Sequence, residues 1–349
     1  MAAKKHAMVT LKDVASEAGV SLATASLAIN GNSLVKPETR LRIMEVVQKL
    51  GYVPNENARS LITRRTKVIG LLSVHDSDQN AGIRFKETPG NYFTDMLWSL
   101  EKGIAERGYH AVLEWYNVND QTPPMLANAN LVDGIICVGG LAHQRLLGML
   151  KACGVPIVLV GSRSKTIDYV DVDLEEAAYL ATKYIVSQGH RDILMLAGPR
   201  GSQSSPRKLE GFRKALEEAR MDDTARSVFT HDFSGAAGMS RTKQVFDSGF
   251  RPTAIVAATD SLGVGALHYL HSVGLSCPED VSIIGYENST FAQYAIPSLT
   301  TMAINEGALG KDACDILFHR LENPGSRHVA VLHHATLLEQ DSVCRREGA

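Results

Sequence analysis

The apolar residues at the start of the chain have the spacing of short amphipathic helices. The first set follows the i, i+3, i+4, i+7 rule at Leu11, Val14, Ala15 and Ala18. Thr10 can cap the first turn, Asp13 can complete a capping-box-like pair with it, and Gly19 ends the helix. The pattern therefore predicts a helix between residues 10 and 19.

Two further helices are predicted before residue 52. The second begins after Ser21, a good N-cap, and turns its small or apolar positions inward at Ala25, Ala28 and Ile29. Its partly outward positions are Leu22, Ala23, Thr24 and Ser26. The third begins at Pro37, ends at Gly51 and presents Leu41, Met44, Val47, Gln48 and Leu50. A helix, a tight turn, a second helix and a bracing helix can place a recognition helix in the major groove of DNA. A three-helix packing module without a nucleic-acid partner has the same periodicity.

Beyond residue 66 the pattern changes to buried apolar runs separated by helical segments. Strands are predicted at 68–74, 110–116, 131–139, 156–162, 169–173, 192–198, 254–260, 281–288 and 298–302. Helices are predicted at 92–107, 177–187, 262–273 and 307–321. Strands alternating with helices indicate parallel sheets. About 280 residues exceed what one core usually supports, so we expect two α/β lobes with the strand carboxyl ends facing a shared ligand cleft.

A last apolar stretch, residues 329–338, has the pattern of a single strand. It contains adjacent histidines, His333 and His334. Neighbours on a strand point to opposite faces, so we do not expect these two side chains to ligate one metal ion.

Charge divides the chain at the same place as the change of pattern. Residues 1–67 hold eleven Lys and Arg against five Asp and Glu, a net charge of +6. The chain totals of 36 and 38 leave 25 basic and 33 acidic residues for 68–349, a net charge of −8. A basic head on an acidic body favours nucleic acid as the partner of the head.

The head segment resembles the N-terminal headpiece of LacI-type bacterial transcriptional regulators. The matching residues are TLKDVASEAGVS at 10–21, Thr24 to Ser26, Asn30, Glu38 to Arg40, LGY at 50–52, Pro54 and Asn55, and ARSL at 58–61. The resemblance implies an N-terminal all-α helix-turn-helix domain at residues 1–53 and a hinge helix or linker at 54–66. It further implies a two-lobed α/β core with parallel sheets, similar to periplasmic binding proteins, at 67–349.

The resemblance also implies a set of DNA contacts. Leu22 and Ala23 match positions that touch base edges. Positions that contact or support the sugar-phosphate backbone are matched by Thr10, Leu11, Ser21, Thr24, Ser26, Asn30 and Tyr52. Leu27 departs from the family, because many relatives carry there an Arg that reads guanine. We expect base readout to depend on apolar contact with thymine methyl groups or on other side chains; alternatively, Leu27 packs inside.

Residues 54–65 match the hinge. Asn55 can cap a short helix, which is too short and polar to be stable alone and is expected to order on DNA. In the family, two hinge helices pair in the minor groove and insert a leucine into a base step. Leu61 matches that leucine, with Asn55, Ala58 and Arg59 beside it. The alternative is a disordered linker with an incidental leucine.

The core resembles the family's effector domain at 210–219, 278–286 and 297–301. The resemblance implies a small metabolite, commonly a sugar or a nucleobase, bound between the lobes. Asp260 matches an acid that accepts hydrogen bonds from the ligand. Tyr92 and Phe93 match an aromatic pair against the ligand, although such aromatics alone are as typical of a core. The other predicted effector-binding residues are Arg163, Lys208, Tyr286 and Glu287.

Several positions depart from the family pattern, so we expect a retuned pocket. Lys208 stands where Arg is usual, and Glu287 and Asn288 stand where two Asp are common. Residues 75–90 are longer than the family's loop. They are interpreted as a lid, as part of the dimer face, or as an exposed variable loop.

Motifs of other protein classes are missing from the sequence. It has no P-loop, no complete G-x-G-x-x-G after a strand, no G-x-S-x-G and no H-E-x-x-H, so we expect no enzyme activity, cofactor or metal. Five cysteines without a C-x-x-C pair are expected to be reduced thiols. Residues 1–8 lack an apolar signal segment and no run of 18 apolar residues occurs, which predicts a cytoplasmic protein without a membrane partner.

The expected function is that of a homodimeric transcriptional regulator, with repression as the default. Two headpieces would bind a pseudo-palindromic double-stranded operator, and a carbohydrate-like effector would change the lobe angle and thereby the pairing of the hinges. The alternative is a cytoplasmic solute-binding or sugar-processing protein with an incidental basic head. Loss of specific DNA binding on removal of residues 1–65 would favour the regulator.

Overall fold

The computed structural model describes residues 9–52, 65–75, 90–117, 122–139, 144–221 and 227–346. The chain divides into two compact units, Met1–Thr66 and Lys67–Ala349. Outside the described residues lie the predicted hinge residues Asn55, Ala58, Arg59 and Leu61, and also residues 76–89 of the predicted insertion.

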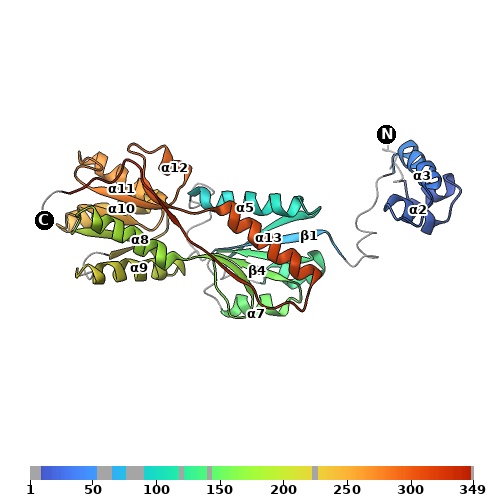
Figure 1. Ribbon diagram of the computed structural model, residues 1–349, viewed down its shortest axis with the longest axis horizontal. Coiled ribbons are helices and arrows are strands. Elements are labelled where there is room, and N and C mark those ends of the chain that lie inside the picture. The colour runs from blue at the N-terminus through green and yellow to red at the C-terminus, as the bar shows by residue number, and fades with distance from the viewer. Residues whose placement is uncertain are drawn as a thin grey trace, which may run out of the picture. The chain divides into compact units, whose positions relative to one another are not determined.

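The first unit contains three helices, as predicted: α1 (Leu11–Glu17), α2 (Leu22–Ile29) and α3 (Pro37–Leu50) (Figure 1). Thr10 caps α1 through a capping box, in which the Asp13 carboxylate accepts a hydrogen bond of 2.8 Å from the Thr10 backbone N–H. The Ser21 hydroxyl accepts from the Thr24 N–H at the start of α2. Gly51 ends α3 in the left-handed conformation, with φ 62°.

A small apolar core joins these helices. Its buried members are Val14, Ala18, Ala28, Val35 and Ile43. Val47 and Leu50 pack against this core, but Leu41 and Met44 of the predicted set are exposed. The predicted face of α3 was therefore wrong at its start, because Ile43, Val46, Val47 and Leu50 form the i, i+3, i+4, i+7 set that meets α1 and α2.

The second unit contains two sheets. Lobe 1 holds the order β11-β5-β4-β3-β1-β2, and lobe 2 holds β12-β10-β9-β8-β6-β7. The strands of lobe 1 are β1 (Val68–His75), β2 (His110–Asn117), β3 (Gly134–Val138), β4 (Ile157–Val160), β5 (Asp168–Val172) and β11 (Ala330–His333). The strands of lobe 2 are β6 (Ile193–Pro199), β7 (Ser227–Thr230), β8 (Ala254–Ala257), β9 (Ser282–Glu287), β10 (Thr300–Ala303) and β12 (Thr336–Leu338). Neighbouring strands pair in parallel, as predicted, except that β12 is antiparallel to β10.

Helices cover both faces of each sheet (Figure 1). In lobe 1, α5 (Gly90–Ala105) and α13 (Glu306–Glu322) pack on one face and α7 (Gln144–Ala152) on the other. Short turns at α6 (Pro124–Ala127) and η2 (Ala129–Leu131) precede β3. In lobe 2, α8 (Leu174–Ser187) and α9 (Ser204–Glu218) cover one face, and α10 (Gly235–Asp247) and α11 (Asp260–Ser272) cover the other. The short helix α12 (Thr290–Gln293) lies between β9 and β10.

Within the described residues the chain passes between the lobes after β5, after β10 and after β11. The third crossing corrects the prediction of one strand at 329–338. This stretch forms β11, which pairs in parallel with β5 of lobe 1, and β12, which pairs with β10 of lobe 2. Both halves have the same alternating pattern, so only the pairing partners reveal the break between them.

Candidate DNA-binding and ligand-binding sites

Helix α2 has one face buried in the headpiece and an opposite face exposed to solvent. Ala25 and Ala28 are buried against the headpiece core, as predicted. The Leu22 side chain is 52% exposed, and Ala23 is also exposed. Leu27 is 36% exposed, so the alternative in which it packs inside is wrong. The outer face of α2 is therefore open to a partner and consists largely of apolar side chains.

The residues predicted to support the DNA backbone lie around α1 and α2. Thr10 and Ser21 are the N-caps of these helices, and their hydroxyls bond Asp13 (2.7 Å) and Thr24 (2.8 Å) respectively. Asn30 is exposed at the C-terminal cap of α2. The half-buried positions are Leu11, Thr24, Ser26 and Tyr52. The structure thus brings the described members of the predicted set onto one small headpiece.

Asp260 is the first residue of α11 and lies just after β8. Its side chain is fully buried, and it accepts hydrogen bonds from the Ser289 N–H (2.6 Å) and the Thr301 hydroxyl (2.7 Å). A Cβ added at Gly285 would lie 2.2 Å from the carboxylate, so glycine is needed for this approach. Burial raises the pKa of Asp260, although these hydrogen bonds oppose the shift. Asp260 is thus held in place by donors of lobe 2 itself.

Lys208, Tyr286 and Glu287 come together beside Asp260. The Lys208 ammonium is buried, donates to the Ala258 carbonyl oxygen and lies 3.6 Å from the centre of the Tyr286 ring. Burial lowers the pKa of Lys208 and raises the pKa of Glu287, while the attraction between the two opposes both shifts. The Oε2 atom of Glu287 is buried and has no hydrogen-bond partner among the described residues.

Glu306 is a further member that the sequence did not reveal. It is the first residue of α13 in lobe 1. Burial raises its pKa to about 7, and the nearby carboxylates of Asp95 and Asp260 add to the shift. We call Lys208, Asp260, Glu287 and Glu306 the acid–lysine cluster. It joins one ammonium and three carboxyl groups from both lobes, so it can accept hydrogen bonds from a ligand with several donors.

Arg163 lies in an ion-pair network at the first crossing between the lobes. Its Nε is 2.7 Å from the Asp171 carboxylate, which is almost completely buried on β5. Arg207 of α9 reaches the same carboxylate oxygen at 2.8 Å and also donates to the Val172 carbonyl oxygen. Arg163 therefore binds its own chain in this structure, and Arg207 links lobe 2 to lobe 1.

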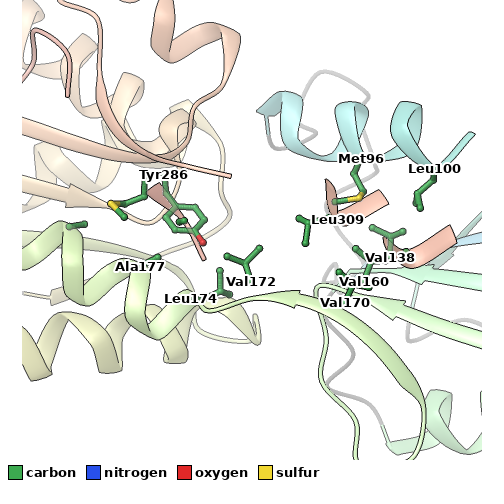
Figure 2. Packing of buried hydrophobic residues seen from close by; sticks show 14 of the residues in the cluster. Met96, Leu100, Val138, Val160, Val170, Val172, Leu174, Ala177, Tyr286 and Leu309 are labelled. Atoms are coloured by element: carbon green, nitrogen blue, oxygen red, sulfur yellow. The ribbon is translucent and has the colours of Figure 1, made fainter. Parts of the chain in front are cut away.

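The predicted aromatic pair is described only in part, because the Tyr92 side chain lies outside the described residues. Phe93 is half-buried and lies 5.3 Å from the Trp115 ring, centre to centre. On the side of lobe 2, Tyr286 extends from β9 toward Val172 and Leu174 at the first crossing (Figure 2). These apolar side chains continue the buried cluster from one lobe to the other.

The two adjacent histidines bond separate partners. His333 Nε2 lies 2.9 Å from Asp312 of α13, and His334 bonds Glu176 of α8. Across the described ranges, no group of three or more His, Cys, Asp or Glu side chains could hold a metal ion. Among the helices that the structure describes, none is long and apolar enough to cross a membrane.

Comparison with known proteins gives two family matches. Residues 10–55 match bacterial regulatory proteins of the lacI family, and residues 182–343 match a periplasmic binding protein-like domain. The HTH-type transcriptional repressor PurR of Salmonella paratyphi B is 33% identical over 344 residues, which cover 96% of this chain and 97% of PurR.

Solved structures of similar proteins match almost the whole length of this chain. The lac repressor dimer bound to operator and the anti-inducer ONPF is 24% identical, with a TM-score of 0.84, and the match covers 97% of this chain and 100% of that one. The complex of the transcriptional regulator CelR with cellobiose is 28% identical, with a TM-score of 0.69 and coverage of 96% and 99%. The predicted fold class is thereby confirmed.

Proposed function

Because the chain belongs to the lacI family of bacterial regulatory proteins, we propose that it is a repressor that binds a pseudo-palindromic operator as a homodimer and responds to a small ligand. The observation that carries the proposal is the open outer face of α2 on a capped three-helix headpiece. A helix presented in this way fits the major groove. The regulator would act in the cytoplasm, where operator DNA is found.

Each expected domain is assigned its own function in this proposal. Residues 1–53 bind DNA, with Leu22 and Ala23 at the base edges. The side-chain hydroxyls and the Asn30 amide around α1 and α2 contact the sugar-phosphate backbone of the DNA. Residues 54–66 form the hinge, in which Leu61, flanked by Asn55, Ala58 and Arg59, enters the minor groove. The operator-bound dimer of the lac repressor supports this arrangement, since its fold matches almost the whole chain.

The ligand is proposed to bind at the acid–lysine cluster in the 67–349 core. Ligands of open α/β sheets bind beyond the carboxyl ends of the strands, where Asp260 and Glu287 lie. The unpartnered oxygen of Glu287 can accept a hydrogen bond from a ligand hydroxyl. A carbohydrate-like ligand is supported by these acceptors and by the cellobiose complex of CelR. Because Lys208, Asp260 and Glu287 are buried, the ligand enters when the lobes move apart at the crossings.

A second copy of the chain is proposed to cover an apolar surface on lobe 2. We call Phe291, Tyr294 and Ile296 the α12 surface; Tyr294 and Ile296 are 81% and 92% exposed. These three large apolar side chains lie within six residues of one another, and exposed apolar patches mark interaction sites. The dimeric lac repressor supports a second copy as the occupant.

Footprinting of the full-length protein tests the proposal. On genomic fragments we expect protection of an inverted repeat, and we expect cellobiose or another sugar in a ligand panel to change that protection. Thermal shift in the same panel identifies the ligand, since selective binding to the native fold raises its Tm. No protected inverted repeat at any salt concentration or with any ligand would refute the proposed function.

A further inference from the structure

The outer face of α2 contains almost no group that can form a hydrogen bond with a base. At about 100° per residue, Leu22, Ala23 and Leu27 fall within one arc of about 140° on the helix. Ser26 lies in the same arc but is half-buried. From residue 22 to residue 29 the helix carries no charged residue. Whatever this helix distinguishes, it does so mainly through apolar contact.

The major groove offers one apolar feature to such a face. Guanine, adenine and cytosine are told apart there by donors and acceptors, whereas thymine adds a C5-methyl group. Leucine and alanine side chains cannot exchange hydrogen bonds with the first three bases, but they gain contact by covering the methyl group. Leu22 and Leu27 both have exposed apolar surface available for that contact.

We infer that α2 selects its half-site by covering thymine methyl groups with Leu22 and Leu27, without a guanine contact. The inference rests on the proposed function, because it requires a specific operator. It further specifies the partner as a half-site with thymines at the bases that α2 faces. Phosphate contacts elsewhere on the head supply affinity that does not depend on sequence.

The test begins with selection of the operator from random duplexes by the full-length protein. Each thymine of a half-site is then replaced by deoxyuridine, which removes the methyl group and leaves base pairing unchanged. We expect Kd to rise about fourfold for each contacted methyl group, as for loss of one buried methylene-sized group. Deoxyuridine outside the protected region should leave Kd unchanged.

The outcomes separate the two proposals. If no specific operator is selected, the proposed function fails. If an operator is bound but deoxyuridine at every thymine of the half-site leaves Kd unchanged, the thymine inference fails and the proposed function stands.

Variants assign the methyl contacts to particular residues. Leu27→Ala should abolish the rise in Kd that deoxyuridine causes at one position of each half-site, and Leu22→Ala should abolish that rise at another position. Leu27→Arg should shift selection toward guanine at the Leu27 position, because Arg can bond its O6 and N7 atoms. Leu41→Ala is the matched control, since Leu41 is an exposed leucine on α3 and should keep every such rise in Kd. Unchanged rises in Kd in both α2 alanine variants, with parental melting curves, would overturn the inference.

Discussion

Glu306 shows how the tertiary fold changes the pKa of a single residue. Its carboxyl interacts with Asp260 of the other lobe, although the two residues are far apart in the sequence. No local pattern marks that approach, because β9, β10 and the second crossing bring the two together. Asp260 itself was predicted from the family resemblance, because it matches an acid that accepts hydrogen bonds from the ligand. The resemblance thus indicated the lobe 2 members of the cluster but not its lobe 1 member, and their role in ligand binding stays a prediction.

The raised pKa of Glu306 predicts a pH dependence of stability. Its ordinary value is 4.5 and its value in the folded protein is about 7. Between these pH values the folded chain holds a proton that the unfolded chain has lost, so this group makes the free energy of unfolding fall as pH rises. In Glu306→Gln the free energy of unfolding should fall less with rising pH, because glutamine does not titrate. The difference should be on the order of 1 kcal/mol, because solvent screens the partly exposed carboxyl group of the parent.

Denaturant titrations at pH 4.5 and pH 7 measure this difference. Glu322→Gln is the matched control, because Glu322 is an exposed carboxylate at the other end of the same helix. The control should keep the full fall of the parent. An identical pH dependence in Glu306→Gln and the parent would contradict the assignment.

At the scale of elements, the sequence predicted the three headpiece helices and four helices of the core, but it missed α7, α9 and α10 and placed the buried face of α3 wrongly at its start. Helix α3 contains two apolar sets, one starting at Leu41 and one at Ile43, and both have helical spacing. Only packing against α1 and α2 decides between them, and it buries Ile43. The prediction of a single strand at 329–338 was wrong for a related reason. The alternation of apolar and polar residues does not indicate which sheet each half of the stretch joins.

The corrected face of α3 gives a second prediction. Ile43→Ala leaves a cavity in a core of few residues and should cost about 2 to 5 kcal/mol. That loss should unfold the headpiece and abolish operator binding while the melting of the 67–349 unit is unchanged. Leu41→Ala, at an exposed position, should cost less than about 0.5 kcal/mol. Circular dichroism and operator binding follow both variants, and equal behaviour of the two would rule out the observed packing.

The ion pair between α9 and β5 gives a third prediction. In Arg207→Met the buried Asp171 carboxylate keeps Arg163 but loses its partner from lobe 2. The free energy of unfolding should fall by about 1 to 3 kcal/mol, because a buried charge is left with fewer hydrogen bonds. Lys243→Met breaks an exposed pair with Asp247 within α10 and should cost at most about 0.5 kcal/mol. Similar losses in both variants would argue against a structural role for the link between the lobes.

The molecule as a whole combines two units with separate chemistry. The basic charge of the head and the acidic charge of the core were visible in the sequence, and the boundary between the two units lies at residue 66. Alternating strands and helices predicted two α/β lobes because each strand is a local apolar run. The three crossings and the apolar α12 surface depend on contacts distant in sequence, so the pattern could not predict them.

The α12 surface makes the final prediction, which concerns assembly. Ile296→Asp places a charge in the proposed contact between two copies and should convert the dimer to a monomer in sedimentation velocity. Two linked headpieces bind one operator with a high effective concentration, so the monomer should bind at least about 100-fold more weakly. Leu131→Asp changes an exposed leucine on η2 of lobe 1 and should keep both the dimer and its affinity. A dimer that persists in Ile296→Asp would show that the second copy binds elsewhere.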